Sequence, residues 1–172
     1  YRIWNRKRSQ RVQSILLGQD KVDRMARFTV LNLSLFGIAN AEIYRGNSLL
    51  PGSPLDRYHG KCDLILTNPP FGARFSCSDL AMHSIRYFPF LHNHIQTSSG
   101  TVDSELLFLD MYLTLLKPGG TVLAVLPDSV VSASGLPSVL RDGIQRNWSI
   151  RSITELPAVT FAQAGTRTKT CI

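Results

Sequence analysis

The sequence is poor in cysteine and contains no long hydrophobic run, and each shortage argues against a class of protein. Its three cysteines are odd in number and show no paired spacing, so they predict reduced thiols and not a disulfide framework. No stretch is apolar for long enough to cross a bilayer, and the N-terminus lacks the apolar core of a signal peptide. We therefore expect a cytoplasmic protein that makes no membrane contact.

Acidic residues are also scarce: 12 Asp and Glu stand against 19 Lys and Arg, which gives a net charge of +7. This excess favours a polyanionic partner, although a basic protein without one has the same composition. Part of it lies in an N-terminal cluster, which either contacts phosphate or forms an exposed helix face: Arg2, Arg6, Lys7, Arg8 and Arg11. Hydrophobic residues make up 44% of the 172 positions, which is typical of about one globular domain.

A metal site is not expected. His83, His92 and His94 lie close together in the sequence, but no acidic residue or cysteine stands at ligand spacing from them. A solvated or DNA-facing loop explains these histidines better than a zinc site does.

Predicted strands and helices alternate along most of the chain. This order predicts an α/β fold with a doubly wound, mostly parallel sheet. The predicted strands cover residues 14–20, 41–45, 62–67, 121–126, 150–156 and 168–172, and the predicted helices cover 22–36, 105–116 and 138–147. Gly37 stands where a helix C-cap is expected, and Asp103 or Ser104 can cap the second helix. Residues 73–103 show no clean period, and we expect a functional loop or insertion with little helix there.

The predicted sheet is incomplete at its N-terminal end. A doubly wound sheet binds its ligand beyond the carboxyl ends of its central strands, usually beside a Gly-rich turn. Nothing before Asp20 resembles such a turn. The chain opens at Tyr1, not at a methionine, and stops at Ile172 inside a predicted strand. We therefore expect residues 1–172 to be a partial catalytic domain of a longer polypeptide.

The most informative motif is Asn68-Pro69-Pro70-Phe71, which follows the apolar run 62–67. An exocyclic amine on a purine is a weak nucleophile, because its lone pair is delocalised into the ring. Two acceptors against its N–H bonds, the Asn68 side-chain oxygen and the Pro69 carbonyl, would favour a pyramidal nitrogen. Phe71 would stack on the ring face. The alternative is a plain turn that ends a strand, since this composition is common in turns.

Residues 63–72 resemble the catalytic block of the methylation subunit of type I restriction–modification systems, which are N6-adenine DNA methyltransferases. The resemblance extends over nearly the whole chain, except the stretch after Gly72. Its other matching segments follow in the family's order: residues 17–20, 24–26, 32–33, 46–49, 105–127, 156–161 and 168–170. The resemblance implies a Rossmann-like methyltransferase fold, S-adenosylmethionine as methyl donor and adenine in double-stranded DNA as acceptor.

The resemblance also implies roles for single residues. Asp20 would accept hydrogen bonds from the donor's ribose; the alternative is an ordinary acid at a helix N-terminus. Asn47, where the family usually has Asp, would face the donor's adenine, and an amide there can still accept and donate. Asn68 would lie at the donor as well as at the target. Phe161 resembles the second aromatic that holds a flipped base, whereas its alternative is a core aromatic.

The family acts with a separate specificity subunit and in some cases with a restriction subunit, so we expect such partners here. Two alternatives stay open. Similar Asn-Pro-Pro-aromatic motifs serve methyltransferases of RNA bases or of protein glutamine, although the block from Leu156 to Phe161 argues against them. An inactive remnant that binds nucleic acid or a partner subunit is the other, because the Gly-rich turn is not seen.

Overall fold

The computed structural model describes residues 15–157, 159–161 and 168–172. The N-terminal basic cluster, Arg2 to Arg11, lies outside the described residues. The chain divides into two compact units, the first made of residues 1–48 and 52–55, the second of residues 49–51 and 56–172. Each unit is described by itself.

The first unit is a β–α–β segment. Strands β1 (Leu16–Asp20) and β2 (Ala41–Arg45) pair in parallel, and helix α2 (Asp23–Leu35) connects them. The predicted glycine C-cap of α2 is confirmed: Gly37 has φ +74°, its N–H donates to the Ser34 carbonyl, and Ile38 N–H donates to the Leu33 carbonyl. This pair of bonds is the Schellman arrangement, in which the left-handed residue is usually glycine.

Little of α2 is buried. Along this helix, which is described throughout, Ala26 is its one buried residue. Large apolar side chains of the helix and its ends are exposed instead: Val22, Met25, Phe28, Val30, Leu31, Leu35 and Phe36.

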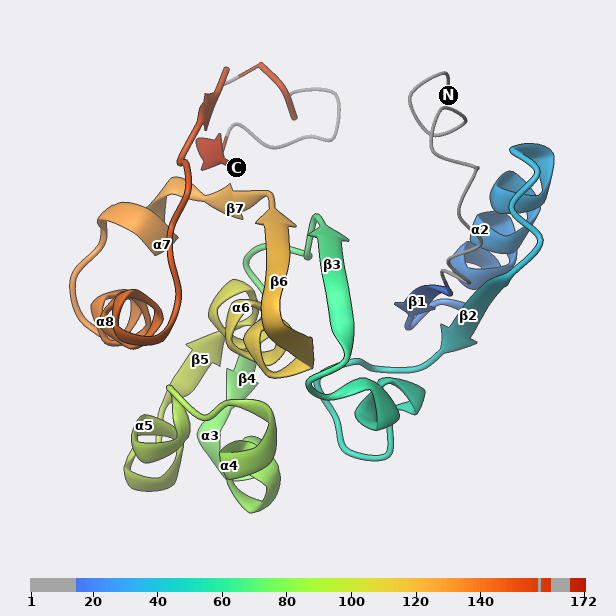
Figure 1. The fold of residues 1–172 in the computed structure, drawn as a ribbon. Helices are drawn as coiled ribbons and strands as arrows, with labels where there is room; N and C mark the ends of the chain where they lie inside the picture. Colours follow the sequence, from blue (N-terminus) through green and yellow to red (C-terminus); the bar gives the residue numbers. More distant parts are fainter. Residues whose placement is uncertain (1–14, 158, 162–167) are drawn as a thin grey trace. The chain divides into compact units, whose positions relative to one another are not determined.

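The second unit is built around a parallel pair, β3 (Cys62–Thr67) and β6 (Leu116–Ala124), with helix α6 (Ser104–Leu115) leading directly into β6. A short 3-10 helix, η1 (Pro54–Tyr58), precedes β3 along the chain. Figure 1 shows β3 and β6 side by side with their arrowheads at the same edge. The strands end together because Thr67 pairs with Ala124.

The first part of β6 is irregular. Cys62 pairs with Leu116 but Leu64 pairs with Thr121, so the turn residues Lys117 to Gly120 are contained in a bulge. Gly119 has φ +78°. A Cβ at Gly120 would lie 2.8 Å from the Cys62 carbonyl oxygen, so the backbones approach too closely for a side chain. The predicted strand 121–126 is thus present up to Ala124, and its pairing with β3 already begins at Leu116.

Residues 73–103 differ from the predicted loop. Strands β4 (Arg74–Ser76) and β5 (Thr101–Asp103) pair antiparallel, and between them lie α3 (Cys77–Leu80), η2 (Ala81–His83), α4 (Ser84–Tyr87) and α5 (His92–Thr97). Several of their side chains belong to the hydrophobic core: Cys77, Leu80, Tyr87, Phe88, Leu91, Ile95 and Val102. The helices are four to six residues long, too short to leave a 3.6-residue period in the sequence.

The C-terminal part adds two helices and a small antiparallel sheet. In chain order its elements are β7 (Leu126–Pro127), α7 (Asp128–Ser132), α8 (Leu136–Asn147), β8 (Glu155–Leu156) and β9 (Thr170–Cys171). β9 lies between β7 and β8. The predicted strand 150–156 is therefore reduced to its last two residues, and α7 was not predicted.

The predicted α/β class is confirmed, with parallel pairing in both units. The described strands of the first unit form the sheet β1–β2, and those of the second unit form three small sheets, β3–β6, β4–β5 and β7–β9–β8. The core of the second unit consists mainly of side chains from α6, the short helices α3 to α5 and the residues between them. None of the helices in the described part of the chain is long and apolar enough to span a membrane.

Candidate active site

The end of β3 is held firmly where the Asn-Pro-Pro-Phe motif begins. The Thr67 carbonyl accepts a hydrogen bond of 3.0 Å from Val125 N–H, and the Thr67 hydroxyl lies 2.7 Å from the Tyr112 hydroxyl. Burial raises the pKa of Tyr112 to about 12, against the opposing effect of the Thr67 bond, so this phenol is neutral at neutral pH. The residue that follows β6 and a side chain of α6 therefore fix the residue before Asn68.

The turn after Asn68 is attached to the N-terminus of α6. The Ser104 hydroxyl donates to the Pro70 carbonyl at 3.0 Å, and Ser104 N–H donates to the Ala73 carbonyl at 2.8 Å. Gly72 N–H donates to a Glu105 carboxylate oxygen at 3.3 Å. Ser104 and Glu105 are both buried, so the side chains that bond the turn have little freedom to move.

Neither of the two predicted acceptors is bonded to a described residue. The Asn68 side chain is exposed, whereas Pro69 is buried. Within the part of the chain that the structure describes, no donor reaches the Asn68 amide oxygen or the Pro69 carbonyl. An exposed amide and a free carbonyl at a rigid turn can accept hydrogen bonds from a ligand.

The structure brings the two predicted aromatics together. The Phe71 and Phe161 ring centroids lie 6.5 Å apart with the rings nearly perpendicular, at 86°. Both residues are half-buried, so Phe161 is not a fully buried core aromatic. Its turn is closed by Thr160, whose N–H and hydroxyl both donate to the Pro157 carbonyl. Residues 162–167, which follow Phe161, lie outside the described residues.

Asp20 and Asn47 lie in the first unit. One Asp20 carboxylate oxygen accepts Val22 N–H at 2.7 Å, and no donor among the described residues reaches the other oxygen. The Asp20 carbonyl accepts Gly46 N–H at 2.9 Å, which brings the neighbouring Asn47 to the carboxyl end of β1. Both side chains are half-buried. One oxygen of the carboxylate is thus held by a backbone N–H and the other has no donor among the described residues, a geometry that fits both the ribose-binding role and an ordinary acid before a helix.

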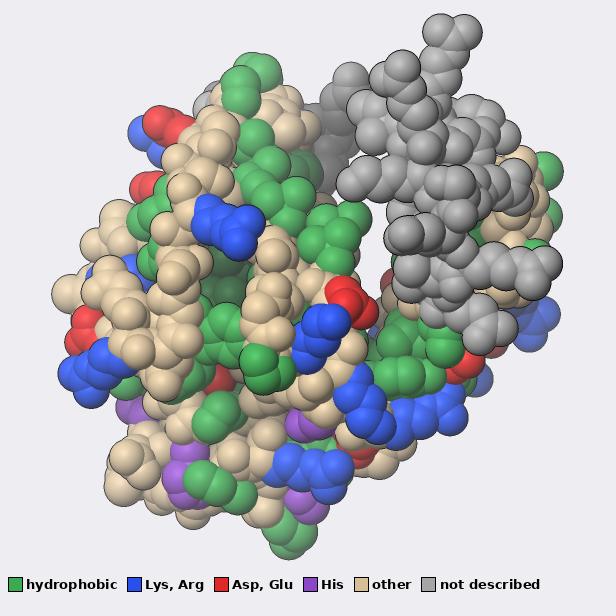
Figure 2. All heavy atoms as spheres, in the orientation of Figure 1, with side chains coloured by type: hydrophobic (Ala, Val, Ile, Leu, Met, Phe, Trp, Pro, Cys, Tyr) green, Lys and Arg blue, Asp and Glu red, His purple; other side chains and the backbone are tan. Residues whose placement is uncertain are grey.

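The histidines do not gather with acidic side chains or cysteines into one cluster in the part of the chain that is described. No group of three or more His, Cys, Asp or Glu side chains capable of holding a metal ion exists among the residues described. Figure 2 shows the histidine side chains at separate places over the surface, not in one cluster. His92 instead contacts the buried Ser84 hydroxyl at 2.8 Å, through its Nδ1 atom.

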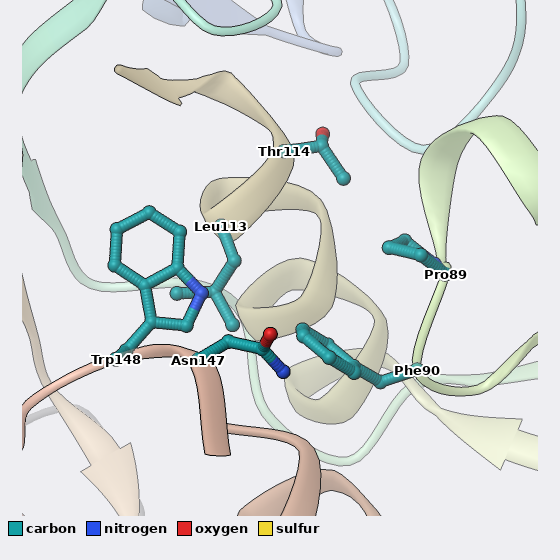
Figure 3. A pocket seen from close by; sticks show the side chains of 6 residues that line it. All are labelled: Pro89, Phe90, Leu113, Thr114, Asn147 and Trp148. Atoms are coloured by element: carbon teal, nitrogen blue, oxygen red, sulfur yellow. The ribbon is translucent and has the colours of Figure 1, made fainter. Parts of the chain in front are cut away.

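A hollow of about 270 Å³ lies away from the motif, at the C-terminal end of α6. Figure 3 shows Phe90, Asn147 and the Trp148 indole around it; the full lining is Pro89, Phe90, Leu113, Thr114, Asn147 and Trp148. Leu113 lies nine residues after Ser104 on α6, roughly 14 Å along the axis at the usual rise per residue. This hollow is therefore separate from the candidate site.

Sequence reasoning missed the supporting residues Tyr112, Ser104 and Glu105. Asp103 is the N-cap of α6 by position but makes no capping hydrogen bond with its side chain. Its carboxylate instead pairs with Arg74, at 3.1 Å from Nε. The available signal was that a Ser-Glu pair opens a helix otherwise strongly apolar.

Comparison with known proteins shows the family of the chain. The profile of the family described as N-6 DNA Methylase matches residues 2–172. The methylase subunit of the type I restriction enzyme StySPI from Salmonella potsdam is 24% identical over 160 residues, which are 91% of this chain and 27% of that protein. The EcoKI methylase subunit of Escherichia coli K12 is 24% identical over 163 residues, 91% of this chain and 27% of that protein.

A solved structure has the same fold. The methyltransferase subunit of a type I restriction–modification system from Streptococcus thermophilus superposes with a TM-score of 0.67 at 22% identity. The match covers 91% of this chain and 32% of that one, so the chain spans about a quarter to a third of the length of its relatives. Its fold is therefore that of a methyltransferase subunit, and the chain belongs to the N-6 DNA methylase family.

Proposed function

We propose that this chain carries the catalytic motif of a site-specific DNA methyltransferase, which moves a methyl group from S-adenosylmethionine to the N6 amino group of adenine. The protein would act as the methylation subunit of a restriction–modification system. The observation that carries the proposal is a pair of acceptors that no donor among the described residues reaches, the Asn68 amide oxygen and the Pro69 carbonyl, at a turn whose Pro70 carbonyl and Gly72 N–H are bonded.

The proposed chemistry needs positioning and no strong base. Hydrogen bonds from the amino group to Asn68 and Pro69 localise the nitrogen lone pair and direct it away from the ring plane. S-adenosylmethionine, when bound, supplies an electrophilic methyl group on a sulfonium. The new N–C bond forms as the S–C bond breaks, and the nitrogen then releases one proton to water. Asn68 accepts hydrogen bonds throughout and does not take that proton.

Phe71 and Phe161 would hold the target base after it leaves the duplex stack. A base sandwiched between two rings needs roughly 7 Å between them, about twice the 3.4 Å spacing of stacked bases. The rings lie 6.5 Å apart but edge to face. One ring must therefore turn toward the plane of the other as the base enters.

The first unit would bind the methyl donor. The free carboxylate oxygen of Asp20 suits a pair of ribose hydroxyls, since its other oxygen is held by Val22 N–H. Asn47 would meet the donor's adenine, with its amide both accepting and donating. The parallel pairs β1–β2 and β3–β6 are of the kind found in a doubly wound methyltransferase sheet.

The proposed partners are double-stranded DNA, a specificity subunit and a restriction subunit. The net charge of +7 is consistent with a polyanionic substrate. Since sequence choice would come from the specificity subunit, selective methylation should require it.

A parallel acceptor assay tests the proposal. The protein as expressed in its host is incubated with methyl-labelled S-adenosylmethionine and with DNA, RNA or protein, and the products are hydrolysed for mass spectrometry. N6-methyladenine in DNA is the expected product. Label found in RNA or glutamine would point to the alternative methyltransferases, and no label in any acceptor would favour the inactive remnant.

A further inference from the structure

The two carbonyls of the Pro-Pro turn differ in their partners. The Pro70 carbonyl accepts the Ser104 hydroxyl at 3.0 Å. The Pro69 carbonyl has no donor among residues 15–157, 159–161 and 168–172. Of the two proline carbonyls, the described part of the protein therefore bonds the second and leaves the first without a donor.

Ser104 and Glu105, the first two residues of α6, make the side-chain bonds to the turn, and we call them the α6 N-terminal pair. The Ser104 hydroxyl has a single hydrogen, which lies between the Pro70 carbonyl at 3.0 Å and the Glu105 carboxylate at 3.1 Å. The same Glu105 oxygen accepts Gly72 N–H at 3.3 Å. The pair thus forms hydrogen bonds to the residues on both sides of Phe71, to Pro70 and to Gly72.

The pair can hold the turn because it cannot move easily itself. Ser104 is 0% exposed and Glu105 is 8% exposed. Behind them, Leu106 and Leu107 of α6 are in the hydrophobic core. In front, Asp103 pairs with Arg74 in the β4–β5 ladder, which fixes the start of the helix.

We propose that Ser104 and Glu105 are positioning residues for the transfer step, a role that rests on the proposed function. They would set the direction of the Pro69 carbonyl and the Phe71 ring without touching substrate or donor. A buried hydrogen-bonded support is expected to matter for rate, since a displacement of about 1 Å in a reacting geometry can cost roughly 100-fold.

The first test compares Ser104→Ala with a matched variant, Ser84→Ala. Ser84 is also 0% exposed, and its hydroxyl also donates to a backbone carbonyl, that of Ala81, at 2.9 Å. It lies in α4, where its other partners are His92 and Gln96 and not the motif. Both variants should lower the thermal unfolding midpoint, but only Ser104→Ala should lower the rate of methyl transfer.

The second test asks whether the Glu105 oxygen is what matters. Glu105→Gln keeps an acceptor for Gly72 N–H and the Ser104 hydroxyl in nearly the same shape, whereas Glu105→Leu removes it. We expect the Gln variant to transfer close to the wild-type rate and the Leu variant to lose rate as Ser104→Ala does.

Single-turnover methyl transfer to DNA and S-adenosylmethionine affinity are measured for each variant in the protein as expressed in its host. A drop of about 100-fold in rate for Ser104→Ala, at unchanged donor affinity, would support the role. Equal rates for Ser104→Ala and Ser84→Ala, or equal rates for the two Glu105 variants, would overturn it while leaving the proposed function intact. Failure of the wild-type protein to methylate DNA would overturn the proposed function itself, and this role with it.

Discussion

The two units of the chain place their candidate site residues on very different supports. In the second unit Asn68 follows a strand whose end is bonded to both β6 and α6, above a core of many buried side chains. In the first unit Asp20 and Asn47 sit beside α2, of which only Ala26 is buried. A group that must direct a lone pair needs a rigid base, whereas a carboxylate that binds hydroxyls tolerates some movement.

The largest expected effect is on the rate of methyl transfer, and it should distinguish a residue of the second unit from a residue of the first unit that binds the donor. Asn68→Ala should lower single-turnover methyl transfer by about 10³-fold, the upper range for loss of one preorganised polar group, with little change in donor affinity. Asp20→Ala should instead weaken S-adenosylmethionine binding, which calorimetry measures directly. Asn147→Ala, an exposed asparagine on α8, is the matched control and should change neither quantity.

A second prediction compares the supports themselves. Leu107 is 0% exposed, so Leu107→Ala should lower the free energy of unfolding by about 2–5 kcal/mol. Leu31 on α2 is 54% exposed, and Leu31→Ala should change it by about 0.5 kcal/mol or less. Urea denaturation measures both. Equal losses would show that α2 is buried in solution and would break the contrast between the units.

A third prediction concerns the buried Asp110 of α6, whose carboxylate accepts the Leu91 and Phe90 N–H groups. Burial raises the pKa of Asp110 to about 7 despite these hydrogen bonds. The folded state thus binds a proton that the unfolded state has released, so stability should fall as pH rises from about 4 to about 7.

Asp110→Asn removes this titration. Urea denaturation across that range should show a flatter profile for the variant, which should be more stable than wild type above pH 7. An unchanged slope would mean that Asp110 is ionised in the folded protein throughout.

The smallest effect is expected at the surface. Arg74 and Asp103 form an ion pair whose side chains are 71% and 45% exposed, so Arg74→Ala should cost at most about 1 kcal/mol of unfolding free energy. The loss should shrink as salt is added. A larger, salt-independent loss would indicate that β4–β5 pairing depends on Arg74 through packing of its stem.

The elements with a clear period were predictable from the sequence, and the rest were not. Helices α2 and α6 and strand β3 carry long apolar patterns with recognisable ends, so they appear within a residue or two of the predicted bounds. The segment 73–103 failed because its buried residues lie on helices of about one turn, whose order comes from tertiary packing.

The residues of the candidate site that would contact a ligand were predictable from the sequence, whereas the residues that hold them in place were not. Asn68, Pro69 and Phe71 are adjacent in a motif, and Phe161 could be matched by resemblance to its family. The Thr67–Tyr112 bond joins residues 45 positions apart, and the bond from Ser104 to Pro70 joins residues 34 apart. Contacts of such separation leave no local pattern to recognise.

The placement of the three cysteines gives the protein an internal reporter of local opening. Cys62 in β3 is half-buried, whereas Cys77 and Cys171 are buried. Burial and the neighbouring Asp63 raise the pKa of Cys62, so even this thiol should react slowly at neutral pH. A thiol-labelling time course, with the labelled peptides identified by mass, would report local opening at two places. Labelling of Cys77 would report opening of the helical segment after Phe71, and labelling of Cys171 would report opening of strand β9. Comparing the two labelling rates with and without DNA or a methyl donor would show which of the two segments opens more often when a ligand is added.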